Sequence, residues 1–207
     1  MDPSAKFWDK TADKYAASSI SNEEVYEKKL AKTREYFSPE MDVLEFGCGT
    51  GSTAIAHAPF VKHIHAIDFS QNMIEIAKRR ANEAQVQNVT FATATIDDLE
   101  AADETFDAVL GLNVLHLLED REAVIANVHR VLKPGGAFVS STVCMGNAMK
   151  LLSWIVPIGK WVGLMPQVRA FPKQALLDEM TRAGFTIDYQ WEPGIARSIF
   201  VVAKKTG

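Results

Sequence analysis

The chain has 207 residues, of which 47% are hydrophobic and 23% charged, a globular composition that excludes a disordered, collagen-like or disulfide-rich protein. Its 22 basic and 26 acidic residues give a formal net charge of −4, which argues against a DNA partner and disfavours any nucleic-acid partner. The two cysteines, the absence of a visible signal segment and the absence of a long apolar run predict one cytoplasmic domain over residues 1–207.

The first forty residues are predicted to be helical and to form a cover over the domain. Ser21 and Glu24 have the three-residue spacing of a capping box, in which side chains satisfy backbone amides at a helix start. Because Pro39 cannot continue a helix, we expect the helix to end after Phe37.

Short apolar segments alternate with helical patterns along the rest of the chain. Strands are expected at residues 43–46, 63–67, 89–94, 106–112, 137–143 and 199–203, and the apolar residues alternate over 187–191. This alternation predicts an α/β fold whose largely parallel sheet has helices on both faces. Ligands of such sheets bind beyond the carboxyl ends of the strands, so we expect the site in the strand-to-helix loops.

Caps and apolar stripes predict three helices between these strands. Ser70 is expected to cap the first and Asp120 the second. The apolar stripe of the second helix extends to Leu132, and Pro134 with the two glycines after it is expected to end that helix. The third helix is expected within residues 171–184.

A glycine-rich loop follows the first predicted strand, with the sequence Glu45-Phe46-Gly47-Cys48-Gly49-Thr50-Gly51. Glycines let the chain turn sharply and let a ligand approach the backbone, and amides at the next helix start attract anions. The dinucleotide fingerprint G-x-G-x-x-G needs its third glycine at the position of Ser52. Because the loop alone also fits an ordinary turn, the residues around it decide whether it binds a ligand.

Acidic residues follow the next two strands. Asp68 ends the second strand, where a carboxylate can accept hydrogen bonds from the ribose hydroxyls of an adenosine group. The alternative is an acid that only starts the next helix. After the third strand, Asp97 can accept a hydrogen bond from an adenine amine, and the alternative there is a solvated acidic turn that includes Asp98.

In combination, these segments resemble the class I S-adenosylmethionine-dependent methyltransferases, in particular the small-molecule type found in quinone biosynthesis. The resemblance covers nearly the whole chain, with five family motifs in order at residues 43–53, 67–70, 95–99, 106–116 and 130–136. The N-terminal segment Phe7-Trp8-Asp9-Lys10, with Ala12 and Tyr15, is similar to the opening of these enzymes. Methyltransferases that modify nucleobase or glutamine nitrogens carry prolines directly after the residue that corresponds to Asn113. No proline follows Asn113 here, which argues against those acceptors.

The resemblance implies a Rossmann-like sheet of seven strands in the order 3-2-1-4-5-7-6, with the last strand antiparallel. It implies S-adenosyl-L-methionine as the cofactor, S-adenosyl-L-homocysteine as the product and no metal. Asn113 is then expected beside the transferred methyl group, and Tyr15 over the cofactor. The other implied cofactor-binding residues, from the methionine end to the adenine end, are Glu45, Gly47, Cys48, Gly49, Asp68, Phe69, Met73, Ile96 and Asp97.

His116 is the candidate catalytic residue. It follows the fourth strand at the mouth of the expected site, where an imidazole can deprotonate a substrate hydroxyl or amine near neutral pH. The alternative is a histidine that only supports the loop. We interpret Cys48 and Cys144 as small buried side chains rather than as nucleophiles. We interpret His63 and His65 as part of a polar strand face rather than as a metal site.

The sequence therefore predicts methyl transfer from S-adenosylmethionine to a small apolar or aromatic acceptor by in-line displacement. Three other functions are open: an RNA methyltransferase, a non-catalytic S-adenosylmethionine-binding protein and a dinucleotide-dependent oxidoreductase. The first draws support from residues 123–177, which carry six Lys or Arg and no acid. The last is disfavoured by Ser52 and Asp97. The oligomeric state is open.

Residues 144–171 are predicted to form a lid-like insertion, since strand-to-helix connections are usually about 2–6 residues long. The segment is rich in apolar side chains and carries only positive charge, and Met149, Trp154 and Trp161 are the expected acceptor contacts. This pattern indicates an apolar lid with a cationic rim, for an apolar acceptor or for peripheral contact with an anionic membrane. The alternative is a segment that packs on the N-terminal helix.

Overall fold

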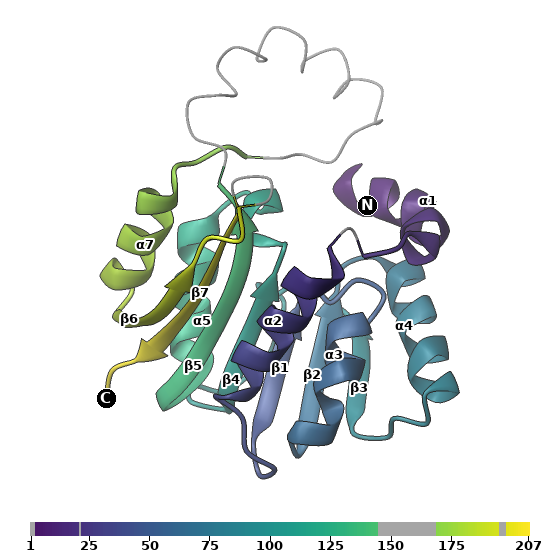
Figure 1. The fold of residues 1–207 in the computed structure, drawn as a ribbon, viewed down its shortest axis with the longest axis horizontal. Helices are drawn as coiled ribbons and strands as arrows, with labels where there is room; N and C mark the ends of the chain where they lie inside the picture. Colours follow the sequence, from purple (N-terminus) through teal and green to yellow (C-terminus); the bar gives the residue numbers. More distant parts are fainter. Residues whose placement is uncertain (1–2, 21, 145–168, 195–197) are drawn as a thin grey trace, which may run out of the picture.

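The computed structural model describes residues 3–20, 22–144, 169–194 and 198–207, which are arranged around a central sheet (Figure 1). The strands lie in the order β3-β2-β1-β4-β5-β7-β6. The pairs among β1 to β5 are parallel, and β7 is antiparallel to both of its neighbours. This order and the antiparallel last strand confirm the predicted fold. The strands are β1 (Asp42–Phe46), β2 (His63–Asp68), β3 (Val89–Thr93), β4 (Phe106–Leu112), β5 (Leu132–Val143), β6 (Phe185–Trp191) and β7 (Ser198–Lys205).

Helices cover both faces of the sheet (Figure 1). One face packs against α3 (Ser52–His57) and α4 (Gln71–Glu83), with α2 (Glu23–Arg34) beside α3, and the other against α5 (Arg121–Val131) and α7 (Lys173–Arg182). Short 3-10 turns, η1 (Ala58–Phe60) and η2 (Leu115–Leu117), follow α3 and β4. The N-terminal helix α1 (Pro3–Ala17) packs on α4. Within the described residues, no helix is both long and apolar enough to cross a membrane.

The start and end of α2 differ from the sequence prediction. Its cap is Asn22, whose side-chain oxygen accepts a hydrogen bond of 2.9 Å from the amide of Val25, and Ser21 lies outside the described residues. The helix ends at Arg34, three residues before Phe37. The backbone tightens there into turns, in which the amide of Phe37 donates to the carbonyl of Arg34.

The junction of α5 and β5 also differs. Asp120 caps α5 as predicted, but the helix ends at Val131, so the prediction that Leu132 belongs to the helix was wrong. Leu132 is the first residue of β5 and pairs with Phe106 of β4. The following Pro-Gly-Gly forms an irregularity inside the strand, where Gly135 has a φ of 76°. Strand pairing with a distant segment therefore overrides the helical pattern.

A fully buried histidine, His57, makes stability sensitive to acid. Its ring lies edge-on to Phe37, and neither ring nitrogen has a hydrogen-bond partner among the described residues. Burial, with a smaller contribution from Arg34, lowers the pKa of His57 from 6.5 to about 3. Between these values the unfolded chain binds a proton that the folded chain does not, so folding stability falls as the pH drops.

We expect His57→Leu to flatten this acid-side loss of stability. Between pH 7 and pH 3.5 the variant should lose less stability than the parent, by on the order of 3 kcal/mol. Urea unfolding at several pH values measures the difference. Parallel pH profiles for the two proteins contradict the assignment.

Candidate active site

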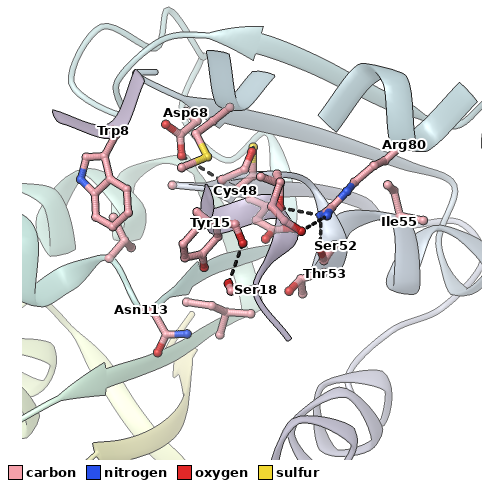
Figure 2. Close-up of a pocket in the computed structure, with 18 of the residues that line it drawn as sticks. Trp8, Tyr15, Ser18, Cys48, Ser52, Thr53, Ile55, Asp68, Arg80 and Asn113 are labelled. Carbon is pink, nitrogen blue, oxygen red and sulfur yellow. Dashed lines mark hydrogen bonds between the residues drawn. The ribbon is translucent and has the colours of Figure 1, made fainter. Parts of the chain in front are cut away.

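A cavity of about 930 Å³ lies at the carboxyl ends of β1, β2 and β4 (Figure 2). The sheet continues from β1 to β2 on one side and to β4 on the other, and open α/β sheets bind ligands where the strand order reverses in this way. The walls come from α1, the loop after β1, the start of α4 and the residues after β4. Small-molecule sites usually measure about 300–1,000 Å³, so this cavity has room for a cofactor and a second small molecule.

The three glycines of the loop after β1 all have positive φ, but they have different surroundings. A Cβ atom on Gly47 would lie 2.6 Å from Cγ2 of Val114, and one on Gly51 would lie 2.9 Å from the ring of Phe91. Gly49 meets only the ring of Tyr15, at 3.9 Å. Gly47 and Gly51 are therefore required by packing, whereas Gly49 leaves backbone open to the cavity.

Asp68 is the acid at the end of β2, and it holds this loop in place. One carboxylate oxygen accepts a hydrogen bond of 2.8 Å from the amide of Gly49, and the other accepts one of 2.9 Å from the amide of Ser70. Burial raises the pKa of Asp68 and Asp9 adds to the rise, while the amide hydrogen bonds oppose it. Each oxygen keeps a lone pair for a ligand in the cavity.

Glu45 is the second acid of the cavity, and one of its oxygens is buried with no hydrogen-bond partner among the described residues. Burial is the main cause that raises its pKa to about 8, and the charge of Asp68 adds to the rise. An unpaired buried carboxylate is costly, so a positively charged ligand group beside Glu45 would be stabilised. The two acids therefore make the β1–β2 side of the cavity suited to a positively charged ligand group.

Helix α1 is fastened to α4 at two points, one in the middle of α1 and one at its C-terminal end. The carboxylate of Asp9 accepts a hydrogen bond of 2.6 Å from the hydroxyl of Ser70, the residue that caps α4 as predicted. Near the C-terminal end of α1, Arg80 donates to the carbonyl of Ala16 at 2.7 Å. Arg80 also donates to the hydroxyl of Thr50 at 2.7 Å, and Figure 2 shows it reaching from α4 toward the loop. The guanidinium thus joins α1, α4 and the glycine-rich loop.

If the cavity binds S-adenosylhomocysteine, as the sequence predicts, Arg80→Met should accelerate its release by roughly tenfold, since the hydrogen bonds of Arg80 to Ala16, Thr50 and Ser52 are worth about 0.5–1.5 kcal/mol each. Stopped-flow dissociation measures the rate. The neighbouring Arg79→Met is the matched control, because the one contact of Arg79 within the described residues is an exposed one with Glu83. Equal release rates for both variants contradict the role of Arg80.

Most of the predicted site residues line this one cavity. It is bordered by Trp8 of the N-terminal segment and by Tyr15, Glu45, Gly47, Cys48, Gly49, Asp68, Phe69, Met73 and Asn113. Asn113 directly follows β4 with a φ of 57°, a left-handed conformation that is uncommon outside glycine. The backbone N–H of Asn113 donates a hydrogen bond of 2.6 Å to the backbone carbonyl of Ser141, which fixes the turn.

Three predicted residues do not line the cavity. Ile96 is buried in the core, and its carbonyl accepts a hydrogen bond from the side chain of Asn127 at 2.9 Å. Asp97 is exposed in the adjacent loop. His116 has its Nδ1 3.1 Å from the hydroxyl of Thr142, and burial lowers its pKa. The predicted lid contacts Met149, Trp154 and Trp161 lie outside the described residues.

Sequence reasoning missed several residues of the cavity wall. The most informative are Arg80 and Tyr26, the latter contributed by α2. Burial raises the pKa of Tyr26, although a hydrogen bond with Thr53 opposes the rise. The residues that Arg80 and Tyr26 contact are far away in the sequence, so no local pattern marks them.

The two cysteines and the paired histidines were weighed as a nucleophile and as a metal site, respectively. Burial raises the pKa of the Cys48 thiol well above its usual value, and that of Cys144 to about 11, so neither is a ready nucleophile. The rings of His63 and His65 are in contact, with centroids 4.6 Å apart. Nowhere in the described ranges do three His, Cys, Asp or Glu side chains group in a way that could hold a metal ion.

Comparison with known proteins identifies the family of the central region. Residues 43–136, which run from β1 into β5, match the model of the family described as methyltransferase domain. Residues 43–136 thus match a methyltransferase domain, and the order of the seven strands is the one that the resemblance to the class I S-adenosylmethionine-dependent methyltransferases implied.

Two curated relatives illustrate the similarity. Over 100 residues the chain is 35% identical to the uncharacterized methyltransferase YcgJ of Bacillus subtilis, covering 48% of this chain and 40% of that protein. Over 112 residues it is 38% identical to demethylmenaquinone methyltransferase of Leptospira interrogans, covering 52% of this chain and 45% of that protein. The aligned part of the chain thus spans less than half the length of either relative.

Solved structures extend the likeness of the fold to most of the chain. The structure of YcgJ from Bacillus subtilis has a TM-score of 0.72 and 19% identity, over 87% of this chain and 99% of that one. Geranyl diphosphate C-methyltransferase of Streptomyces coelicolor also has a TM-score of 0.72, with 16% identity over 89% of this chain and 79% of that one.

Proposed function

We propose that this chain binds S-adenosylmethionine in the cavity and transfers its methyl group to a small apolar or aromatic acceptor. The observation that carries the proposal is the unpartnered buried oxygen of Glu45 beside an open glycine backbone. The cofactor has an ammonium group and a sulfonium, and both suit a negative environment. The methyltransferase-domain match over residues 43–136 supports the same conclusion.

The residues around the cavity fit the parts of this cofactor. Glu45 can accept hydrogen bonds from the ammonium, and Asp68 keeps lone pairs for the ribose hydroxyls. Phe69 and Met73 offer apolar surface to an adenine ring, and Tyr15 lies across the loop from Gly49. The cofactor therefore meets acids at its polar parts and apolar side chains at its base.

The sulfonium supplies the chemical activation of the methyl group, so the protein has to align the acceptor and exclude water. The left-handed backbone at Asn113 supports a positioning role, because uncommon backbone conformations concentrate at functional sites. The side chain of Asn113 lies at the end of β4, on the far side of the cavity from Asp68 (Figure 2). The role of His116 as a base stays a prediction.

The strand order separates this proposal from a dinucleotide-dependent oxidoreductase. The dinucleotide fold has strand order 3-2-1-4-5-6, whereas β7 is here inserted antiparallel between β5 and β6. The relative named for demethylmenaquinone supports an apolar acceptor for this chain.

Calorimetric titration of the full chain with S-adenosylhomocysteine and with NAD tests the cofactor. We expect S-adenosylhomocysteine to bind at one site and NAD to show no heat of binding. Mass spectrometry of reactions with S-adenosylmethionine and a panel of apolar hydroxyl, thiol and amine compounds then tests transfer. Binding of NAD alone contradicts the cofactor, and cofactor binding with no methylated product across the panel favours a non-catalytic protein.

A further inference from the structure

A lysine of α2, Lys29, is hydrogen-bonded to β5, the strand beside the β4 wall of the cavity. Its ammonium donates to the hydroxyl of Ser141 in β5 at 2.8 Å. Ser141 pairs in register with Leu112 of β4, and its carbonyl accepts the hydrogen bond from the amide of Asn113. Leu112 and Asn113 both line the cavity, and so does Tyr26, one helical turn before Lys29. Lys29 does not itself line the described cavity, but Ser141 connects its ammonium to the residues of the β4 wall.

Lys29 carries a charge that nothing nearby balances. It is half-buried, and burial lowers its pKa. In the part of the chain that the structure describes, no carboxylate lies within ion-pair distance of its ammonium, whereas Lys32 on the next turn pairs with Glu35. A partly desolvated ammonium without a counter-ion is unfavourable, so an anion placed beside it would be stabilised.

The charges of the cavity divide between its two sides. Glu45 and Asp68 lie on the β1–β2 side, where the cofactor is proposed to bind. Arg80, the one cation that lines the described cavity, is already engaged by Thr50, Ser52 and a carbonyl of α1. On the β4–β5 side, Lys29 supplies positive charge from behind the lining residues, at Ser141, which suits an acceptor with the opposite sign.

We propose that Lys29 recognises an anionic oxygen, of a carboxylate or a phosphate, on the acceptor substrate and holds the acceptor beside Asn113. This proposal rests on the proposed function, since it takes the β4–β5 side as the acceptor side. It makes Lys29 a specificity-determining residue and narrows the acceptor class to apolar compounds that bear a negative group. The competing explanation is that the lysine stem only fills the interface between α2 and the sheet.

Matched probes that differ in charge separate the two explanations. Octanoate is compared with octanamide, and octyl phosphate with octanol, by calorimetry on the protein with and without saturating S-adenosylhomocysteine. We expect the anionic member of at least one pair to bind tenfold or more tightly than the neutral member. A preference for octanoate over octanamide indicates a carboxylate site, and a preference for octyl phosphate over octanol indicates a phosphate site.

Lys29→Met keeps the apolar stem and removes the charge. It should abolish the preference and leave the affinities for the neutral probe and for S-adenosylhomocysteine unchanged. Lys32→Met is the matched control and should keep the preference, and Lys29→Gln is a second charge-removing variant in case the first does not fold.

Two results overturn the proposal: equal binding of both members of each pair, absence of binding included, or a preference that survives in the charge-removing variants. Failure of S-adenosylhomocysteine to bind overturns the proposed function instead, and the titrations without it still answer the question about Lys29.

Discussion

Replacing Asp68 by alanine is expected to weaken binding of S-adenosylhomocysteine by roughly 100-fold or more. Two hydrogen bonds from ribose hydroxyls to a carboxylate are worth about 1.5–3 kcal/mol each, and each 1.4 kcal/mol is a factor of ten. The same change removes the acceptor of the Gly49 amide, so the loop that faces the cofactor also loses its anchor. Calorimetry on the folded variant measures the loss.

Glu75→Ala provides the control for this prediction. Glu75 is an exposed carboxylate of α4 that accepts a hydrogen bond only from Gln71 among its described contacts, so its removal alters net charge without touching the cavity. Its affinity should match that of the parent. An Asp68→Ala variant that folds and binds with parental affinity would show that the ribose lies elsewhere.

Glu45→Gln is expected to make the ligand-free protein more stable at alkaline pH and to weaken cofactor binding. The folded-state pKa of Glu45 is raised from 4.5 to about 8. Between these values the folded chain holds a proton that the unfolded chain releases, so the stability contributed by Glu45 is lost as the pH rises. Glutamine has no such loss, and its stability relative to the parent should increase by on the order of 3–5 kcal/mol from pH 4 to pH 9.

Urea unfolding of both proteins at pH 4, 7 and 9 measures this difference. Calorimetry in buffers of different ionisation enthalpy adds a second readout, because an ammonium beside Glu45 favours the ionised carboxylate. Cofactor binding at pH 7 should therefore release up to about one proton from the parent and none from the variant. Equal pH profiles and equal proton release in the two proteins contradict the role of Glu45.

Local patterns in the sequence predicted the sheet and most of the cavity. The strands are short apolar runs, and the glycine-rich loop and Asp68 fall at strand ends that the topology brings together. Leu132 was misassigned because its pairing with Phe106 outweighs the local helical pattern, and pairing across a sheet leaves no local signal.

The missed residues depend on contacts between distant segments. Arg80 reaches Ala16 across 64 positions, and Lys29 reaches Ser141 across 112. The packing of α2 and α4 on the rest of the fold decides which side of each helix faces the cavity. A helical periodicity shows that a helix is amphipathic without saying what its polar edge will meet.

The backbone at Asn113 restricts how this position can evolve. Because its φ of 57° is readily adopted only by glycine, asparagine and aspartate, most substitutions would strain the turn after β4 before they altered any chemistry. Asparagine and aspartate have nearly the same shape, but an amide is neutral and both donates and accepts hydrogen bonds, whereas a carboxylate is negatively charged and only accepts them. A single-nucleotide change between them would thus exchange the hydrogen-bonding character of the acceptor side while keeping the turn. In this chain, such a change would alter the hydrogen bonds available to the proposed acceptor without altering the backbone that presents them.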